Sequence, residues 1–191
     1  MRIIAGEFRG RSIVAPQGSG TRPTTDRVRE SMMSMVYSAR GGFEGAAVLD
    51  AFAGSGALGL ESLSRGASRA VFCDRDAGAQ KAVRANLRAC GVGDRCRVLG
   101  GDMLAPLAAL GRLGPFDLVF LDPPYACEPA EIVGMVQRLD GEGLLADDTL
   151  VVYEHSISDR ERALRAASDA GWQVVKSKKF GETAVCLLAR E

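Results

Sequence analysis

After Gly45, short apolar runs alternate with helical stretches, and this alternation constrains the fold more than any other feature of the chain. Such an order predicts a mainly parallel sheet covered by helices on both faces. The first four strands are expected to end at Leu49, Cys73, Leu99 and Leu121, each followed by a helix. Helices at 129–139 and 159–170 are expected on either side of a fifth strand at 149–153.

The end of the chain breaks this pattern. Segments 172–178 and 183–189 are two strand-like runs joined by Phe180-Gly181-Glu182, which predicts an antiparallel hairpin. The expected fold class is therefore α/β, with a doubly wound, mostly parallel sheet of seven strands finished by a hairpin. A chain of 191 residues fits one domain, in which residues 1–40 form an extension and residues 45–191 the core.

The extension is expected to begin with a hairpin over residues 1–15, whose turn lies near Arg9-Gly10. Its apolar strand positions are Ile3, Ile4, Ile13 and Val14. Either Thr24 or Thr25 can cap a following helix that reaches about Ala39. On that helix Val28, Met32, Met35 and Val36 share one apolar stripe, which indicates core packing.

A glycine-rich turn follows the first strand of the core. Gly54, Gly56 and Gly59 satisfy the G-x-G-x-x-G pattern between a strand and a helix, where glycine allows a tight turn and close approach of a ligand. Asp74 ends the next strand 20 residues after Gly54, at the spacing of a ribose-hydroxyl acceptor. Together they predict a site for an adenosine-containing cofactor.

Two further acids bear on which cofactor that is. Asp50 stands four residues before the first glycine, a position that suits the ammonium group of a methionyl moiety better than a pyrophosphate, although Asp can also simply form a turn there. Asp102 follows the third strand and could accept from an adenine amino group, with Met103 against the ring. Asp102 could equally cap a helix at 103–110, and both roles are compatible.

The tetrapeptide Asp122-Pro123-Pro124-Tyr125 directly follows the apolar strand that ends at Leu121. Ligands of open α/β sheets bind at the carboxyl ends of the strands. Two prolines remove backbone donors and leave carbonyls to accept, while Asp122 adds a carboxylate and Tyr125 a stacking face. The group suits an exocyclic amine on a planar ring, although Asp-Pro-Pro can also be a plain turn.

Charge and cysteine usage restrict the partners. The net charge is zero, but residues 1–40 hold seven arginines and three acids, a net of +4 that is compatible with phosphate binding. The five cysteines show no metal spacing, which argues for reduced thiols in a cytosolic protein. His155 is the only histidine, so we expect no metal site. No apolar run approaches a membrane span, and the N-terminus is too soon polar for a signal peptide.

Four segments together resemble the bacterial family of 16S rRNA guanine-N2 methyltransferases known as ribosomal small-subunit methyltransferase D. They are residues 2–11, residues 22–31, residues 48–61 and residues 122–125. The glycine loop and the Asp-Pro-Pro-Tyr loop occur in many amino-group methyltransferases, whereas residues 22–31 carry the narrower assignment. Met32-Met33-Ser34 departs from a common Leu-Phe pair, which should affect packing only.

The resemblance implies a class I, Rossmann-like methyltransferase that uses S-adenosylmethionine, without metal, to methylate the exocyclic N2 of one guanine in 16S rRNA (the guanine 966 class). It implies catalytic roles for Asp122, Pro123, Pro124 and Tyr125. The implied cofactor contacts are Thr24, Asp50, Phe52, Ala53, Gly54, Ser55, Gly56, Asp74, Arg75, Asp102 and Met103. The arginines expected to hold RNA phosphates, within the small subunit or an assembly intermediate, are Arg2, Arg9, Arg11, Arg22, Arg27 and Arg29.

Other functions compete with this prediction. The same motifs would serve an amino methyltransferase acting on DNA adenine or on another RNA. A protein-glutamine methyltransferase usually has Asn in place of Asp122 and ranks lower. An NAD-dependent oxidoreductase or a non-catalytic RNA-binding module would leave one of the two motifs without a purpose. The roles of Glu154, His155 and the Phe180-Gly181 turn stay open at this stage, as does the oligomeric state.

Overall fold

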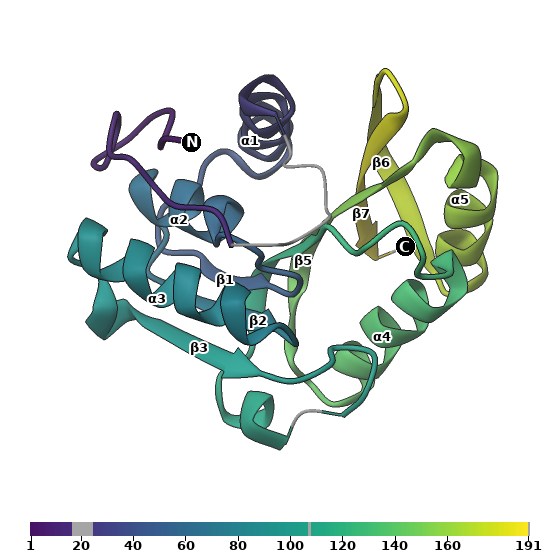
Figure 1. Ribbon diagram of the computed structural model, residues 1–191. Coiled ribbons are helices and arrows are strands. Elements are labelled where there is room, and N and C mark those ends of the chain that lie inside the picture. Colours follow the sequence, from purple (N-terminus) through teal and green to yellow (C-terminus); the bar gives the residue numbers. More distant parts are fainter. Residues whose placement is uncertain (17–24, 107, 191) are drawn as a thin grey trace.

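The computed structural model of the chain describes residues 1–16, 25–106 and 108–190. Its centre is a seven-stranded sheet with strand order β3-β2-β1-β4-β5-β7-β6, covered by helices on both faces (Figure 1). The strands are β1 (Ala47–Asp50), β2 (Arg69–Asp74), β3 (Cys96–Gly100), β4 (Phe116–Leu121), β5 (Leu145–Ser156), β6 (Trp172–Phe180) and β7 (Thr183–Arg190). Strands β1 to β5 run parallel, and β7 pairs antiparallel with both β5 and β6. The predicted sheet and terminal hairpin are confirmed.

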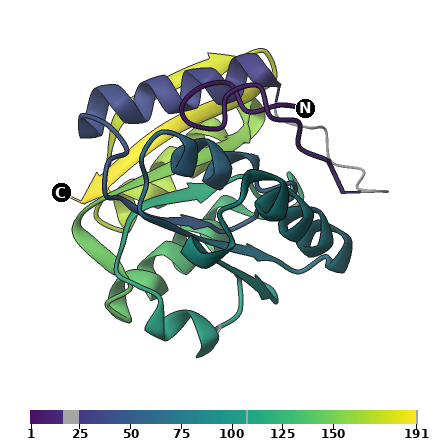
Figure 2. The same ribbon diagram turned by 90° about the vertical axis from the view of Figure 1, so that its left-hand side faces the viewer.

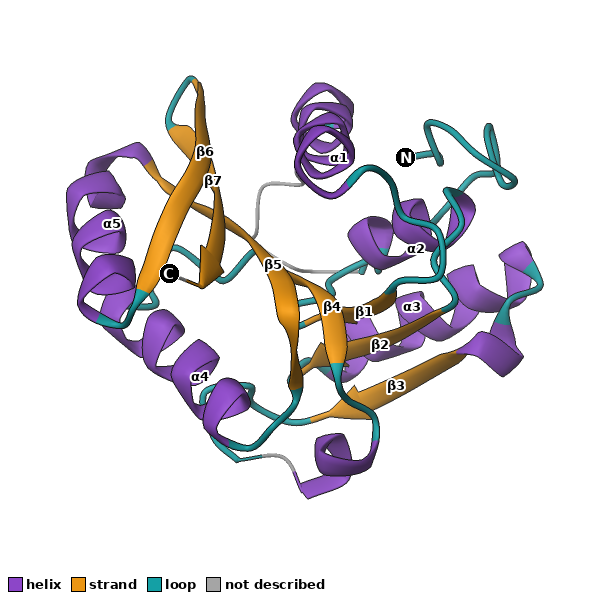
Figure 3. Ribbon diagram, turned by 180° about the vertical axis from the view of Figure 1, so that it is seen from behind, coloured by secondary structure: helices purple, strands orange, loops and turns teal. Residues whose placement is uncertain are grey.

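The two faces of the sheet carry separate cores. Figure 3 shows the sheet and its covering helices from behind. Helices α1 (Asp26–Arg40), α2 (Ala57–Ser64) and α3 (Ala77–Cys90) contribute to one core, and α4 (Pro129–Gly141) and α5 (Arg160–Asp169) to the other. The described residues also contain three short 3-10 helices: η1 (Gly93–Arg95), η2 (Ala108–Arg112) and η3 (Ile157–Asp159). Over the described residues, no helix combines the length and apolar character that crossing a membrane requires.

Strand β4 shows why the central strands are apolar throughout. Leu118 and Phe120 lie in the core on the α1–α3 face, whereas Val119 and Leu121 lie in the core on the α4–α5 face. Alternate residues of a strand point to opposite faces, so a strand covered on both faces must be apolar at nearly every position.

Helix α1 begins and ends as the sequence predicts. The Thr25 hydroxyl accepts a hydrogen bond from the Val28 amide at 3.4 Å, and Gly41 ends the helix in the left-handed conformation at φ 83°. Met32, Met35 and Val36 are buried, and Val28 packs against the same core. Thr24, the alternative cap, lies outside the described residues.

The N-terminal segment is a hairpin in outline, as predicted, but it forms no regular strands. Its ends are joined by an isolated antiparallel bridge between Arg2 and Ser12, and Ile3 N donates to the Arg11 carbonyl at 3.0 Å. Other backbone donors of the segment bind α2: Ile4 N donates to Glu61 Oε1 at 2.7 Å and Phe8 N to Ser64 Oγ at 2.9 Å. The segment therefore packs on α2, whose polar groups satisfy amides that the bridge leaves unpaired.

The helix expected at 103–110 is also absent from the described residues, which contain only η2 in this part of the chain. Met103 is 2% exposed and packs into the core on the α4–α5 face. Arg138 of α4 donates to the carbonyls of both Met103 and Leu104. A side chain from another helix thus satisfies these carbonyls, and the segment stays an irregular loop.

Candidate cofactor and substrate site

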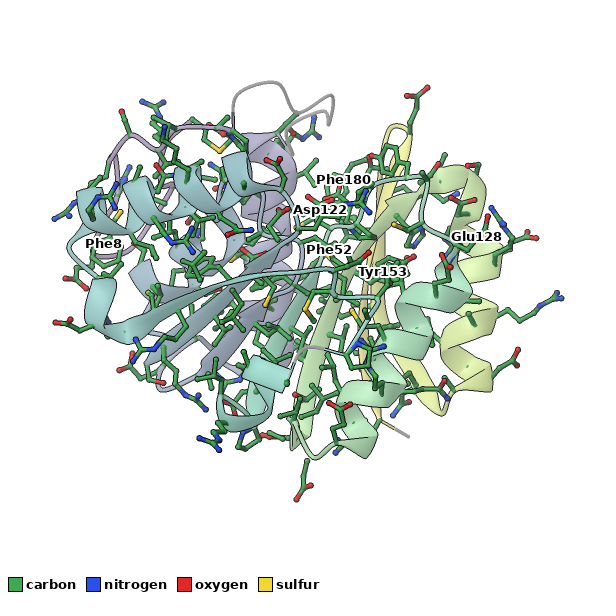
Figure 4. The ribbon with its side chains drawn as sticks, turned by 60° about the horizontal axis from the view of Figure 1, so that its bottom comes forward. Phe8, Phe52, Asp122, Glu128, Tyr153 and Phe180 are labelled. Atoms are coloured by element: carbon green, nitrogen blue, oxygen red, sulfur yellow. The ribbon has the colours of Figure 1, made fainter. Side chains whose placement is uncertain are left out.

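A cavity of about 680 Å³ lies at the carboxyl ends of the parallel strands. Its size is typical of small-molecule and cofactor sites. Figure 4 shows Asp122 in the same region of the molecule as Phe52 of the glycine loop and Phe180 of the terminal hairpin. The predicted residues that line the cavity are Phe52, Ala53, Gly54, Ser55, Asp74, Arg75, Asp102, Met103, Asp122, Pro123, Pro124 and Tyr125.

The glycine loop is held against β2 by backbone donors. Gly54 N donates to Asp74 Oδ2 at 2.8 Å, and Gly56, with φ 77°, forms the N-cap of α2. Gly59 lies inside α2, where an added Cβ would stand 2.4 Å from the Phe72 ring. The three glycines of the motif therefore serve the loop turn, the helix start and close packing of helix on strand, in that order.

Asp50 is the first correction to the predicted site. Its side chain is 1% exposed, does not line the cavity, and accepts from Gly59 N at 3.0 Å. Burial, together with the neighbouring carboxylates of Asp122 and Asp74, raises the pKa of this carboxyl to about 7, against the lowering effect of the Gly59 hydrogen bond. In this structure Asp50 lies behind the glycine loop, and its carboxylate accepts from the loop's helix rather than lining the cavity.

The edge of the cavity beyond β2 is acidic. Asp74 Oδ1 accepts from Asp76 N at 2.9 Å, so both oxygens of Asp74 bind backbone amides of the cavity wall. Asp76 caps α3 by accepting from Ala79 N at 2.6 Å. A carboxylate oxygen can accept more than one hydrogen bond, so these contacts position Asp74 and leave it able to accept hydrogen bonds from a ligand.

The loop after β3 brings Asp102 and Met103 to the same wall. Asp102 Oδ1 accepts from Leu104 N at 3.0 Å, and its other oxygen lies 3.8 Å from Arg75 Nη1. Both charged side chains are well exposed, so this ion pair adds little stability. The buried Met103 supplies an apolar surface beside these acceptors.

The Asp-Pro-Pro-Tyr loop forms the opposite wall. Pro123 is buried and Asp122 half-buried, and the Pro124 carbonyl accepts from Cys127 N at 2.9 Å. The Pro124 carbonyl therefore closes a turn, and its predicted role toward a ligand stays a prediction, because a carbonyl oxygen can accept a second hydrogen bond. Tyr125 is 55% exposed, and its hydroxyl lies 2.9 Å from Thr183 Oγ1 at the start of β7.

Sequence reasoning gave no role in the cavity to several of its lining residues, among them Asp76, Glu154 and Arg29. Glu154 is 5% exposed and lies within β5, next to Tyr153, which pairs with Leu121 in the parallel register. Pairing of the fourth strand with the fifth would have placed Glu154 near Asp122, whereas Arg29 was expected only as a phosphate ligand. His155, next to Glu154, is buried with a lowered pKa caused by burial, as expected for a strand residue rather than a base.

Arg29 is the second correction. It was predicted to hold RNA phosphates, but its side chain is 1% exposed. Its guanidinium donates to Glu61 Oε1 at 3.3 Å, to the Arg2 carbonyl at 2.7 Å and to Asp26 Oδ1 at 3.1 Å. A guanidinium bound on three sides inside the fold ties the N-terminal segment to α1 and α2 and is not a surface phosphate ligand.

The other predicted arginines divide by position. Arg2, Arg9, Arg11 and Arg27 are exposed, and Arg22 lies outside the described residues. Arg11 donates to the Ala89 carbonyl at the far end of α3, whereas the start of α3 lines the cavity. Arg11 is thus held away from the cavity mouth.

The charges of the cavity favour a cationic ligand. Within the described residues, its lining includes five acids and two arginines, and both arginines lie beside carboxylates. The acids are Asp74, Asp76, Asp102, Asp122 and Glu154. A concave, half-apolar wall with excess negative charge raises the local concentration of cations and lowers that of polyanions such as pyrophosphate.

The comparisons with known proteins are consistent with this geometry. A family model described as "Conserved hypothetical protein 95" matches residues 1–189. Ribosomal RNA small subunit methyltransferase D of Escherichia coli K12 is 37% identical over 191 residues, which cover 100% of this chain and 90% of that protein. The protein of the same name from Haemophilus influenzae is 31% identical, covering 95% of this chain and 89% of its own length.

Solved structures agree with the fold. The Escherichia coli protein yhhF superposes with a TM-score of 0.80 at 34% identity, over 100% of this chain and 98% of that one. A ribosomal protein L11 methylase from Lactobacillus delbrueckii reaches a TM-score of 0.69 at 17% identity, over 88% and 81%, and shows the fold alone. The predicted class I, Rossmann-like methyltransferase fold is thereby confirmed.

Proposed function

The chain belongs to the family of conserved hypothetical protein 95, which includes ribosomal RNA small subunit methyltransferase D, and from this membership and the cavity we propose that it methylates the exocyclic N2 of one guanine in 16S rRNA. The observation that carries the proposal is the meeting of Asp122-Pro123-Pro124-Tyr125 with the glycine loop in one acidic cavity. An RNA-binding module without catalytic activity does not require both motifs in one cavity. The acids of the cavity would repel the pyrophosphate of a dinucleotide cofactor.

S-adenosylmethionine fits this cavity by charge and by donor set, and when bound it supplies a methyl group on a sulfonium. Asp74 is the proposed acceptor for the ribose hydroxyls, and Asp102 with Met103 the proposed adenine contacts. Five acids around the site favour the net positive charge of the ligand. Because Asp50 is buried, we assign the cofactor's ammonium group to the cavity acids as a whole rather than to Asp50.

The methyl-accepting nitrogen requires positioning more than activation by a strong base. The lone pair of a guanine amino nitrogen is delocalised into the ring. If Asp122 and the Pro123 carbonyl accept its two hydrogens, that lone pair turns out of the ring plane toward the sulfonium methyl. Positioning of this kind supplies up to about 7–11 kcal/mol in well-oriented reactions.

Tyr125 is suited to hold the ring, since its face is half exposed and its hydroxyl is anchored by Thr183. A guanine must leave its stack to reach the cavity, which costs a few kcal/mol when the base is stacked in a helix. The proposal therefore favours a loop nucleotide as target, either in the small subunit or in an assembly intermediate.

Replacing Asp122 separates chemistry from binding. We expect Asp122→Ala to lower kcat by about 100-fold or more, the size of effect seen when one oriented polar contact to a reacting group is lost. S-adenosylmethionine affinity, measured by calorimetry, should fall far less than kcat, because four of the five cavity acids remain. Asp94→Ala, an exposed acid on η1 away from the cavity, is the matched control and should retain kcat. A parallel collapse of affinity and kcat in Asp122→Ala would assign Asp122 to the cavity wall alone.

A further inference from the structure

Strand β6 holds an unusual share of the lysines. The chain has four lysines among 24 basic residues, and three of them, Lys176, Lys178 and Lys179, lie on β6. This strand is one edge of the sheet, and all three side chains are exposed. Preventing edge-to-edge pairing could be the sole role of lysines on an edge strand. Their positions on the strand decide whether they also bind a ligand.

Two of the three lysines point to the same side. Lys178 Nζ donates to Ser31 Oγ at 3.0 Å, and Lys176 Nζ lies 3.4 Å from Ser38 Oγ, so both lie along α1. Residues two apart on a strand share a face, which places Lys179 on the opposite face. Figure 2 shows α1 running along the β6–β7 hairpin.

Helix α1 adds a third cation to this side. Arg27 is exposed and stands four residues before Ser31, so it lies on the same helix face one turn earlier. We call the strip formed by Arg27, Lys176 and Lys178, with the hydroxyls of Ser31 and Ser38, the α1–β6 surface. In the structure its lysines bind neutral hydroxyls, and no ion pair among the described residues neutralises these three cations.

The strip leads to the proposed active site. Lys178 Nζ lies 5.2 Å from the centre of the Phe180 ring, at the end of β6. The next strand begins at Thr183, whose hydroxyl contacts Tyr125 of the catalytic loop. A polymer that places one nucleotide beside Tyr125 can thus continue along β6 without leaving the protein, whereas Arg11 is tied to the far end of α3.

We infer that the α1–β6 surface binds the phosphates of the RNA strand that flanks the target nucleotide, an inference that rests on the proposed function. Separate ammonium groups beside hydroxyl donors suit a chain of phosphates, and the surface reads no base sequence. The occupant is RNA backbone rather than a protein, because exposed cations rather than a continuous apolar patch dominate the strip.

The test is the salt dependence of RNA affinity. Protein-free 16S rRNA lacking the modification is titrated against wild type, against Lys176→Ala with Lys178→Ala, and against Lys81→Ala. Lys81, the fourth lysine, is exposed on α3 and is the matched control. Each lost phosphate contact lowers the slope of log affinity on log salt by about 0.7 to 0.9, so the double variant should lose about 1.5 while the control retains the wild-type slope.

A second readout separates docking from structural damage. The double variant should raise KM for RNA with kcat and S-adenosylmethionine affinity retained, and Lys176→Arg with Lys178→Arg should keep the wild-type slope. An unchanged salt slope of RNA affinity in the Lys176→Ala, Lys178→Ala variant overturns the inference, even if that variant self-associates through strand β6. A loss of affinity seen only with assembled subunits also overturns it, because it would indicate a protein partner. Binding requires no methyl transfer, so absence of N2-methylguanosine with wild type refutes the proposed function separately.

Discussion

Replacing Gly59 with Ala tests how the glycine loop is built. An Ala Cβ at this position would stand 2.4 Å from Phe72 Cε1 and 2.8 Å from Cζ, and the Phe72 side chain is fully buried. Overpacking of this kind costs up to about 3 kcal/mol. Ala gains about 1 kcal/mol over Gly inside a helix, so the net loss of unfolding free energy should be about 2 kcal/mol. For a chain of this size that lowers Tm by about 4–8 °C.

Gly134→Ala is the matched control for this prediction. Gly134 lies in helix α4, is exposed, and has no atom within 4 Å of its added Cβ. The same substitution there should raise the unfolding free energy by about 0.8–1 kcal/mol. Urea unfolding of both variants measures the two signs side by side. If Gly59→Ala matched the stabilisation of Gly134→Ala, the close approach of α2 to β2 would not constrain that glycine.

Three further predictions concern the charged residues. The pKa of Asp50 is about 7 in the folded protein and 3.8 in the unfolded chain, so the protein should lose about 4 kcal/mol of unfolding free energy as the pH rises from 4 to 8. Asp50→Asn should flatten this pH dependence in urea unfolding. Asp74→Ala should weaken S-adenosylmethionine binding by calorimetry, and unchanged affinity would remove Asp74 from the ribose site. Glu61→Ala should cost about 3 kcal/mol by removing the buried acid that pairs with Arg29, and adding Arg29→Met should recover the part that comes from this pair; additive losses would contradict this coupling.

The sheet and its motifs could be predicted because they depend on local patterns. Strands covered on both faces must be apolar at nearly every position, which makes β4 easy to predict. The spacing of Gly54 to Asp74 follows from one strand–helix–strand unit. The hydrogen bond between Gly54 N and Asp74 Oδ2 shows that this spacing brings the two residues together. Helix α1 could likewise be predicted from its N-cap and its apolar stripe.

The sequence predictions were wrong where a charged side chain is buried or where a distant element determines the backbone conformation. The sequence predicts Arg29 to be an exposed cation, but the side chain is buried and binds Glu61, 32 residues away. Asp50 reads as a ligand contact, but the Gly59 amide behind it holds it inside. The loop after Asp102 could have been a helix had Arg138 not bound its carbonyls. Each contact joins residues that no local period relates.

Identifying the nucleoside that receives the methyl group tests the proposed guanine specificity. Wild-type protein is incubated with methyl-labelled S-adenosylmethionine and with small subunits, protein-free 16S rRNA and genomic DNA, all lacking the modification, and the labelled nucleoside is identified after digestion. The proposal predicts label in 16S rRNA as N2-methylguanosine, at one site, and its loss in Asp122→Ala. Label in DNA alone, or in an adenosine of RNA, would contradict the guanine assignment while leaving the fold and the cavity as described.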